Sequence, residues 1–340
     1  MNRKHFVSLV LSSGLVMSVK DLEAATDHHP VKAVRIPPYL YTGHTIGITA
    51  PAGYVTPEQI DPAVKLMESW GFNIKIGNTI GKRDFSLGGT DEERAADFQQ
   101  MLDDPKIHAI MCARGGYGVI RIIDRLNFDR FKNNPKWIIG FSDITVFHCH
   151  LNRKLGIASI HSKMCNSFPS DWSKAEPIQI ETILSIKQAL SGAALKYTGP
   201  ALAINRAGRA EAELVGGNLS IIETLAASES DLDTEGKILF IEDTGEYAYS
   251  IDRMFWNLKR SGKLSKLKGL IIGGFKLKPD DPGDEFGRTV YDIILEKIKE
   301  YEYPVCFDFP VGHQKNNFAL KCGVQYLLNV DANGSSLLSR

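Results

Sequence analysis

Short apolar runs alternate with amphipathic segments between residues 45 and 160, and no other feature of this sequence limits the fold as strongly. The pattern predicts strands at 45–50, 73–76, 109–113, 137–141 and 157–160. It predicts helices at 57–70, 90–102, 117–126 and 144–155. Strands and helices that alternate in this way form a parallel sheet with helices on both faces. We therefore expect an N-terminal α/β domain over residues 43–168.

The pattern changes after about residue 206, and the chain of 340 residues is long enough for a second domain. We predict strands at 211–215, 238–241, 267–272 and 326–330, and helices at 219–227, 250–260 and 289–299. This mixture indicates a mixed α/β domain over residues 206–340. Residues 169–205 are less regular, and we interpret them as a segment that connects the two domains.

The N-terminus has the pattern of a secretory signal peptide. Residues 1–5 are basic, and the apolar run Phe6–Val19 is too short to span a bilayer as a helix. The cleavage site L-E-A-A-T is poor, because Leu or Glu stands where a small residue is required. We expect a removed signal peptide at residues 1–25, a linker at 26–42 and export to the periplasm. The alternative is an amphipathic N-terminal helix on a cytoplasmic protein.

Composition and cysteine spacing exclude several classes of partner. Lys and Arg (40) balance Asp and Glu (40), so the chain has no general attraction for nucleic acid or for an anionic membrane. No later segment approaches transmembrane length, which predicts a mature form without a membrane partner. The five cysteines include no C-x-x-C pair, which argues against zinc and thioredoxin-like chemistry. We interpret Cys112, in an apolar run, and Cys149, in a predicted helix, as buried free thiols.

Two polar loops follow strands of the first domain, at the sheet edge where ligands bind in such folds. The loop A-R-G-G-Y-G (113–118) favours an anion or oxyanion pocket, or a tight strand-to-helix turn. It lacks the G-x-G-x-x-G spacing of a dinucleotide site. The loop G-F-S-D-I-T (140–145) differs from the hydrolase elbow G-x-S-x-G, because Ile144 replaces the second glycine. Ser142 is therefore either a helix cap or a nucleophile at the sheet edge.

Two further motifs belong to the second domain. The stretch I-L-F-I-E-D-T-G-E (238–246) puts Glu242 and Asp243 at the end of an apolar strand, where they could bind a metal, orient a histidine or cap a turn. The stretch P-V-G-H-Q-K-N-N (310–317) contains His313, as a surface histidine or as a general base. Each motif alone is unspecific, but Ser142, Glu242 and His313 together match the three roles of an acyl-transfer triad.

These motifs also recur together in one family. The carriers are G-H-T-I-G-I-T-A-P (43–51), A-R-G-G-Y-G (113–118), I-G-F-S-D-I-T (139–145), L-V-G-G-N-L (214–219), F-I-E-D-T-G-E (240–246) and G-H-Q-K-N-N (312–317). With them, the chain resembles LD-carboxypeptidases, serine peptidases that remove the terminal D-alanine from murein tetrapeptides, and the related microcin C immunity peptidases. The resemblance runs from about Gly43 to Val324.

The resemblance implies an N-terminal Rossmann-like half, a C-terminal half rich in β-structure and a homodimer. It places the nucleophile at Ser142, the carboxylate at Glu242 and the base at His313, so that both domains contribute to one site. The backbone N–H groups of Gly116 and Asp143 are our candidates for the oxyanion donors, because both residues follow neighbouring strands.

A carboxypeptidase must also accept a terminal carboxylate. We take Arg114 and Gly115 as the candidate substrate-binding residues, with a structural salt bridge as the alternative role of Arg114. Two departures from the family pattern bear on the substrate: P-A-G at 51–53 replaces Pro-Ser-Ser, and H-S-K-M at 161–164 replaces His-Gly-Pro-Met.

The resulting expectation is a serine carboxypeptidase that cuts murein tetrapeptides in cell-wall recycling, without metal or other cofactor. One alternative is a peptidase of the same fold that acts on a peptidyl-nucleotide toxin, with Phe168 and Trp172 lining a loop near the site. A second alternative is a noncatalytic periplasmic binding protein with two α/β lobes, which would not need the three residues together.

Overall fold

The computed structural model describes residues 34–340, which form one compact unit. The signal peptide predicted at residues 1–25 lies outside the described residues, as does the first part of the predicted linker. The rest of that linker is packed, since the Leu40 N–H donates to the Leu190 carbonyl (2.8 Å) and the Trp137 indole donates to the Pro38 carbonyl (3.0 Å). Within residues 34–340, no helix combines the length and the apolar character that a membrane crossing requires.

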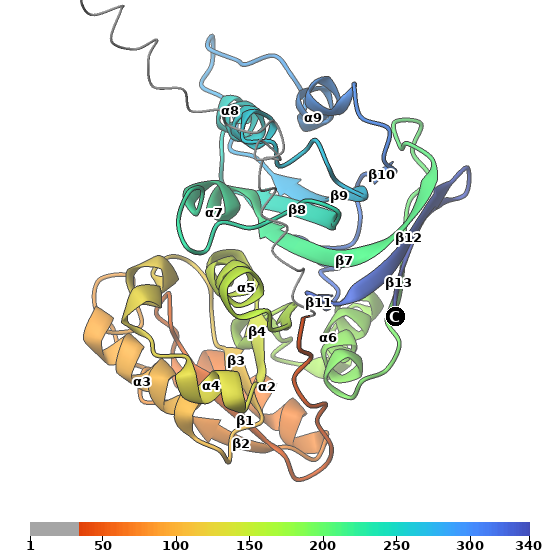
Figure 1. The fold of residues 1–340 in the computed structure, drawn as a ribbon. Coiled ribbons are helices and arrows are strands. Elements are labelled where there is room, and N and C mark those ends of the chain that lie inside the picture. The colour runs from red at the N-terminus through yellow and green to blue at the C-terminus, as the bar shows by residue number, and fades with distance from the viewer. Residues whose placement is uncertain (1–33) are drawn as a thin grey trace, which may run out of the picture. The chain divides into compact units, whose positions relative to one another are not determined.

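The first sheet has six strands in the order β11-β5-β4-β3-β1-β2 (Figure 1). They are β1 (Thr45–Thr49), β2 (Asn73–Ile76), β3 (Ala109–Cys112), β4 (Trp137–Gly140), β5 (Ser159–His161) and β11 (Leu320–Cys322). The five strands of the N-terminal half are parallel, as the sequence predicted. The sixth, β11, comes from the C-terminal half and pairs antiparallel with β5.

Helices cover both faces of this sheet, which confirms the predicted α/β arrangement. One face carries α3 (Asp91–Asp103), α4 (Asp129–Asn133), α5 (Thr145–His150) and the π-helical segment η5 (Leu151–Leu155) that continues α5. The other face carries α2 (Pro57–Ser69) and α6 (Pro177–Leu190). The helices α2 and α3 begin at capping boxes built on Thr56 and Thr90, where a threonine side chain satisfies an unpaired helix N–H.

Two segments differ from the prediction. The helix expected at 117–126 is replaced by two short 3₁₀ turns, η2 (Val119–Arg121) and η3 (Ile123–Arg125). The reason lies in contacts with other elements, because the Val119 N–H donates to the Asp143 carboxylate (2.8 Å) and the Gly118 carbonyl accepts from Arg94 (2.8 Å). The region 169–205 is more regular than expected, since it contains α6 and also η7 (Trp172–Lys174) and β6 (Lys196–Gly199). The short turn η6 (Cys165–Ser167) precedes it.

The second sheet is mixed and has seven strands in the order β10-β9-β8-β7-β12-β13-β6. Its other strands are β7 (Gly208–Asn218), β8 (Ile238–Thr244), β9 (Gly269–Lys276), β10 (Val305–Cys306), β12 (Gln325–Asp331) and β13 (Gly334–Ser339). The strands β10, β9, β8 and β7 are parallel, and β12, β13 and β6 continue as an antiparallel meander. The helices α7 (Leu219–Thr224), α8 (Ala248–Arg260) and α9 (Val290–Ile298) pack on one face. This confirms a C-terminal mixed α/β half rich in β-structure.

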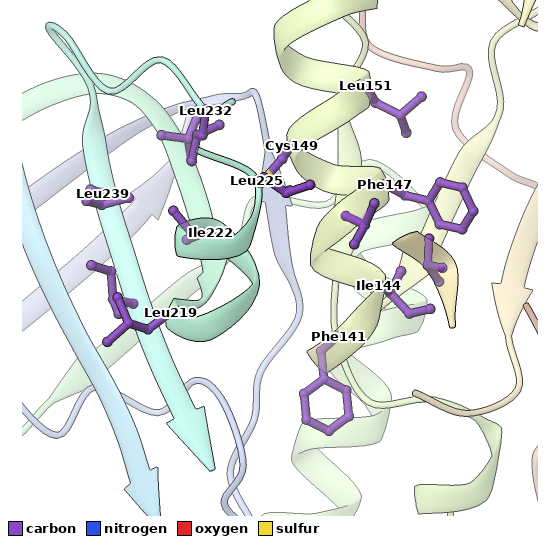
Figure 2. Close-up of a cluster of buried hydrophobic side chains, with 14 of the residues drawn as sticks. Phe141, Ile144, Phe147, Cys149, Leu151, Leu219, Ile222, Leu225, Leu232 and Leu239 are labelled. Atoms are coloured by element: carbon purple, nitrogen blue, oxygen red, sulfur yellow. The ribbon is translucent and has the colours of Figure 1, made fainter. Parts of the chain in front are cut away.

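The two halves share a hydrophobic core. Side chains of α5 and of the 3₁₀ turn before it belong to the same buried cluster as side chains of α7 and β8. Figure 2 shows Cys149 of α5 beside Leu225, which follows α7, with Ile222 and Leu219 nearby. Because this core is continuous and β11 crosses into the first sheet, the two halves are held in one arrangement.

A pair of glycines at the end of β7 allows this close approach. Gly217 has φ +143°, and a Cβ atom there would lie 2.5 Å from Thr145 Oγ1. The next residue, Asn218, donates its backbone N–H to the same hydroxyl (3.1 Å). The end of β7 is therefore docked on the first turn of α5, three residues after Ser142.

The docking of β7 on α5 can be tested by adding one methyl group. We expect Gly217→Ala to lower the free energy of unfolding by about 3 kcal/mol, because it combines backbone strain with overpacking. Gly236→Ala is the matched control, because Gly236 also has positive φ (+71°) but open space around it, and it should cost about 1 kcal/mol. Urea denaturation measures both, and equal costs would contradict the proposed contact.

Candidate active site

Ser142 lies where β4 ends, at the first position of the 3₁₀ turn η4 (Ser142–Ile144). Its φ is +63°, a region that non-glycine residues seldom occupy and that is often found at functional sites. Two glycines make the sharp turn possible. A Cβ atom on Gly115 would lie 3.0 Å from Ser142 Cβ, and one on Gly140 would lie 2.8 Å from the Ile144 side chain. Ile144 thus packs over Gly140, and the turn forms without the second glycine of the hydrolase elbow.

Glu242 and His313 form a direct pair. Glu242 lies in β8 and is fully buried. Its Oε2 atom accepts from His313 Nδ1 (2.6 Å) and also from the His313 backbone N–H (3.2 Å). A carboxylate at this distance keeps the imidazole proton on Nδ1, so Nε2 is left with a lone pair.

Glycines on β9 admit the loop that carries His313. The register between β8 and β9 shifts beside Glu242, so that Gly273 and Gly274 lie opposite this one residue as a bulge. The Gly274 N–H donates to the Val311 carbonyl (2.9 Å). A Cβ atom on Gly312 would lie 2.5 Å from Glu242 Cβ, so the loop backbone passes directly over the carboxylate side chain.

The three predicted triad residues meet at one place. Ser142 and His313 line the same pocket, of about 490 Å³, together with Arg114, Gly115, Gly116, Asp143 and Asn218, and we call it the Ser142 pocket. Glu242 lies directly behind His313, and the Phe141 ring is 4.8 Å from the His313 ring. Within residues 34–340, no hydrogen bond joins the Ser142 hydroxyl to His313. Catalytic hydrogen bonds of this type are often long before substrate binds.

The predicted oxyanion donors lie in the same pocket. Gly116 has φ +103°, and its backbone N–H has no hydrogen-bond partner among the described residues. Asp143 is the second residue of a 3₁₀ turn, a position whose N–H has no partner within the turn. Both N–H groups are therefore available to a ligand beside Ser142.

Arg114 is exposed and lines the Ser142 pocket. Its Nη1 atom donates to the Tyr54 carbonyl (2.9 Å), and no carboxylate of residues 34–340 lies within ion-pair distance of it. The structural salt bridge that was the alternative role of Arg114 is thus not formed. The guanidinium keeps donors that are not used by these contacts.

The side chain of Asp143 has a role that the sequence did not reveal. Its carboxylate accepts from the Val119 N–H (2.8 Å) and thereby holds the end of the A-R-G-G-Y-G loop beside Ser142. The buried Arg94 donates to the carbonyls of Gly118 (2.8 Å) and Pro51 (2.6 Å), which fixes the same loop from the other side. Burial raises the pKa of Asp143 from its ordinary value of 3.8 to about 6.

Asp243 serves a different purpose from its neighbour Glu242. It accepts from the Ser220 N–H (2.8 Å), from the Asn218 side-chain amide (3.1 Å) and from the Thr244 N–H (2.7 Å). Burial raises its pKa to about 6. Of the two adjacent carboxylates, one therefore orients a histidine and the other caps the start of α7.

Within the described residues, no group of three or more His, Cys, Asp or Glu side chains is arranged to hold a metal ion. The five cysteines, all in this part of the chain, are buried free thiols, as predicted for Cys112 and Cys149.

Comparison with known proteins identifies the family of the chain. The LD-carboxypeptidase N-terminal domain matches residues 46–162, and the LD-carboxypeptidase C-terminal domain matches residues 211–328. The chain belongs to the LD-carboxypeptidase family and is a serine-type carboxypeptidase, a hydrolase.

Three similar proteins show how far the likeness extends. The probable murein peptide carboxypeptidase of Bacillus subtilis is 32% identical over 295 residues, covering 86% of this chain and 91% of that protein. The microcin C7 self-immunity protein of Escherichia coli is 26% identical, covering 91% of this chain and 96% of that protein. The crystal structure of muramoyltetrapeptide carboxypeptidase from Oxalobacter formigenes superposes with a TM-score of 0.76 at 26% identity, covering 87% and 98% of the two chains.

Titration of Asp143 gives a pH test of the loop anchor. The folded protein holds the Asp143 proton more tightly than the unfolded chain does, so ionisation of this group lowers stability as the pH rises from about 4 to about 6. Relative to Asp143→Asn, the wild-type protein should lose up to about 3 kcal/mol of unfolding free energy over this interval. Urea denaturation at several pH values measures the difference, and a wild-type gain over the same interval would contradict it.

Proposed function

We propose that the chain releases the terminal D-alanine of murein tetrapeptides through an acyl-enzyme formed on Ser142. The observation that carries this proposal is the 2.6 Å contact between Glu242 and His313, made in a pocket that also contains Ser142. A serine hydroxyl needs a base near neutral pH, and an imidazole held on one side by a carboxylate is suited to that role.

The proposed reaction has two halves. His313 Nε2 takes the proton of the Ser142 hydroxyl as Oγ attacks the scissile carbonyl carbon, and the carbonyl oxygen becomes an oxyanion. The intermediate collapses as the C–N bond breaks, and His313 returns the proton to the leaving amine. His313 then takes a proton from water, which attacks the carbonyl carbon of the acyl-enzyme. The ester C–O bond breaks, His313 returns the proton to Ser142 Oγ, and the shortened peptide leaves with a free carboxylate. Glu242 holds the imidazole in its tautomer and stabilises its cation throughout.

Other groups in the scheme bind the oxyanion and the terminal carboxylate of the substrate. The N–H groups of Gly116 and Asp143 donate to the oxyanion, and each such donor is typically worth about 10²–10³ in rate. Arg114 binds the terminal carboxylate in this scheme. It lies in the loop after β3, directly before Gly115, and Gly115 packs against Ser142. The scheme uses no metal or cofactor.

A second candidate function is hydrolysis of a peptidyl-nucleotide, suggested by the likeness to the microcin C7 self-immunity protein. We expected Phe168 and Trp172 to line the site in that case. Phe168 is instead buried in the core, Trp172 packs against the same cluster, and neither lines the Ser142 pocket. This favours the murein peptide. Membership of a peptidase family likewise disfavours the noncatalytic binding protein.

The role in cell-wall recycling, export to the periplasm and the homodimer stay predictions. Each follows from the sequence or from the resemblance.

Replacement of the proposed nucleophile tests the reaction. Ser142→Ala should abolish release of D-alanine from murein tetrapeptide, because no other group in the scheme attacks the carbonyl, and should leave folding intact. Mass spectrometry of the peptide detects the loss of one alanine residue, and circular dichroism checks the fold. Unchanged turnover would remove Ser142 from the nucleophile role.

Replacement of the proposed orienting carboxylate tests the mechanism further. We expect Glu242→Gln to lower kcat by about 10³–10⁴, because the amide cannot hold the imidazole in the same way or stabilise its cation. Glu235→Gln, at an exposed ion pair with Lys266, is the control for loss of one carboxylate and should retain wild-type kcat. A loss below tenfold for Glu242→Gln would argue against the triad.

A further inference from the structure

A second pocket is lined by His313 but not by Arg114. It has a volume of about 460 Å³ and shares Phe141, Ser167, Thr244 and His313 with the Ser142 pocket. Its own lining includes Lys163, Lys276 and Gln179, and we call it the Lys163 pocket. Both volumes lie in the range of small-molecule sites. Because the two pockets share walls at His313, a ligand bound at Ser142 can extend into both.

Lys163 holds a positive charge at the inner wall of this pocket. Its ammonium donates to the Gln314 carbonyl (2.6 Å) and lies 5.6 Å from the centre of the Phe141 ring. No carboxylate of residues 34–340 lies within ion-pair distance, and this one hydrogen bond leaves two N–H donors without a protein partner. Burial lowers the pKa of Lys163, while the Glu242 carboxylate raises it.

The other lysines of the pocket differ in their partners. Lys276, at the end of β9, is exposed, and no ion pair to a residue in 34–340 is formed. Lys315 lies 2.6 Å from the Glu176 carboxylate and is therefore compensated. The pocket thus contains two ammonium groups without an acidic partner, one of them half-buried. A half-buried charge of this kind is costly unless a counter-charge accompanies it.

We propose that Lys163 and Lys276 bind a carboxylate of the substrate on the acyl side of the scissile bond. This inference rests on the proposed function, in which Arg114 binds the terminal carboxylate one residue beyond that bond. The Lys163 pocket is lined by His313 but not by Ser142 or Arg114, so we assign it to the part of the peptide that remains after cleavage. The substrates it selects are acidic peptides that keep a free carboxylate upstream, as a γ-linked glutamate or a diamino diacid does.

Lys163 places a charged group beside the proposed base. It stands in the H-S-K-M stretch at 161–164 and lines the same pocket as His313. Its ammonium supplies both a positive charge and N–H donors to a ligand in this pocket. A change at Lys163 should therefore alter which acyl groups are bound without touching the three triad residues.

A purely structural role for Lys163 makes a different prediction. The hydrogen bond from its ammonium to the Gln314 carbonyl holds the loop next to His313 in place. Loss of this hydrogen bond would weaken the binding of all substrates alike. A carboxylate-binding role affects only peptides that carry the upstream carboxylate. Two peptides that differ in this one group distinguish the roles.

The experiment uses the full chain with Ser142→Ala, so that binding is measured without hydrolysis. Isothermal calorimetry compares murein tetrapeptide with the same peptide whose upstream carboxylates are amidated, the terminal carboxylate being free in both. We expect the acidic peptide to bind about tenfold more tightly, since a charge-assisted hydrogen bond is lost in the other. Lys163→Met, added to Ser142→Ala, should remove the difference in Kd between the two peptides. Lys163→Arg, which keeps the charge, should keep most of that difference, and Lys276→Met should reduce it. Added Lys266→Met, at a distant surface pair, is the control and should change nothing.

Three outcomes would overturn the subsite. Lys163→Met could weaken the binding of both peptides equally, which indicates a structural role, or it could weaken the binding of neither. Absence of binding by either peptide would overturn it as well. Failure of the proposed function would be detected in a separate measurement, as absence of D-alanine release by the wild-type chain. The binding comparison between the two peptides can be interpreted in either case.

Discussion

The buried carboxylate of Glu242 is the interaction on which the site depends. It is removed from solvent, and both hydrogen bonds that it accepts come from His313, one from the ring and one from the backbone. A buried charge that loses its donors is destabilising by several kcal/mol, roughly 3–5 in comparable pairs. The loop that carries His313 is therefore held in place by the same carboxylate that sets the tautomer of its imidazole, so the proposed proton transfer depends on the order of this loop.

Glycines make the required distances possible in each half. Gly115 leaves room for Ser142, Gly217 for Thr145, and Gly312 for Glu242 itself. A side chain at any of these positions would push apart two elements that must touch. The three contacts lie far apart along the chain, but all of them act on the region where the two sheets present their strand ends. The proposed triad of a hydroxyl, an imidazole and a carboxylate thus depends on small residues that take no part in its chemistry.

Local features of the fold could be predicted from the sequence, and long-range ones could not. The alternation between residues 45 and 160 identified the parallel strands, and threonine caps marked the starts of α2 and α3. The predicted helix at 117–126 has suitable apolar spacing but does not form, because its first residues hydrogen-bond to other elements: the Val119 N–H donates to the Asp143 carboxylate, and the Gly118 carbonyl accepts from Arg94. The bulge at Gly273 and Gly274 could not be predicted from the sequence, since it is explained only by the loop of His313 that packs against it. Ser142, Glu242 and His313 could be proposed as a triad because their motifs occur together, whereas the interest of Lys163 depends on the pocket that it lines.

The strand β11 crosses from the C-terminal half to complete the first sheet beside β5. An incomplete sheet exposes a row of unpaired backbone groups, and such an edge pairs readily with another chain. During synthesis the N-terminal half therefore emerges with an open edge, and it keeps that edge until residues 320–322 have been added and folded back. In a nascent chain the first sheet can therefore be completed only after residues 320–322 have been synthesised, and separate expression of the two halves would leave the first of them with an exposed sheet edge.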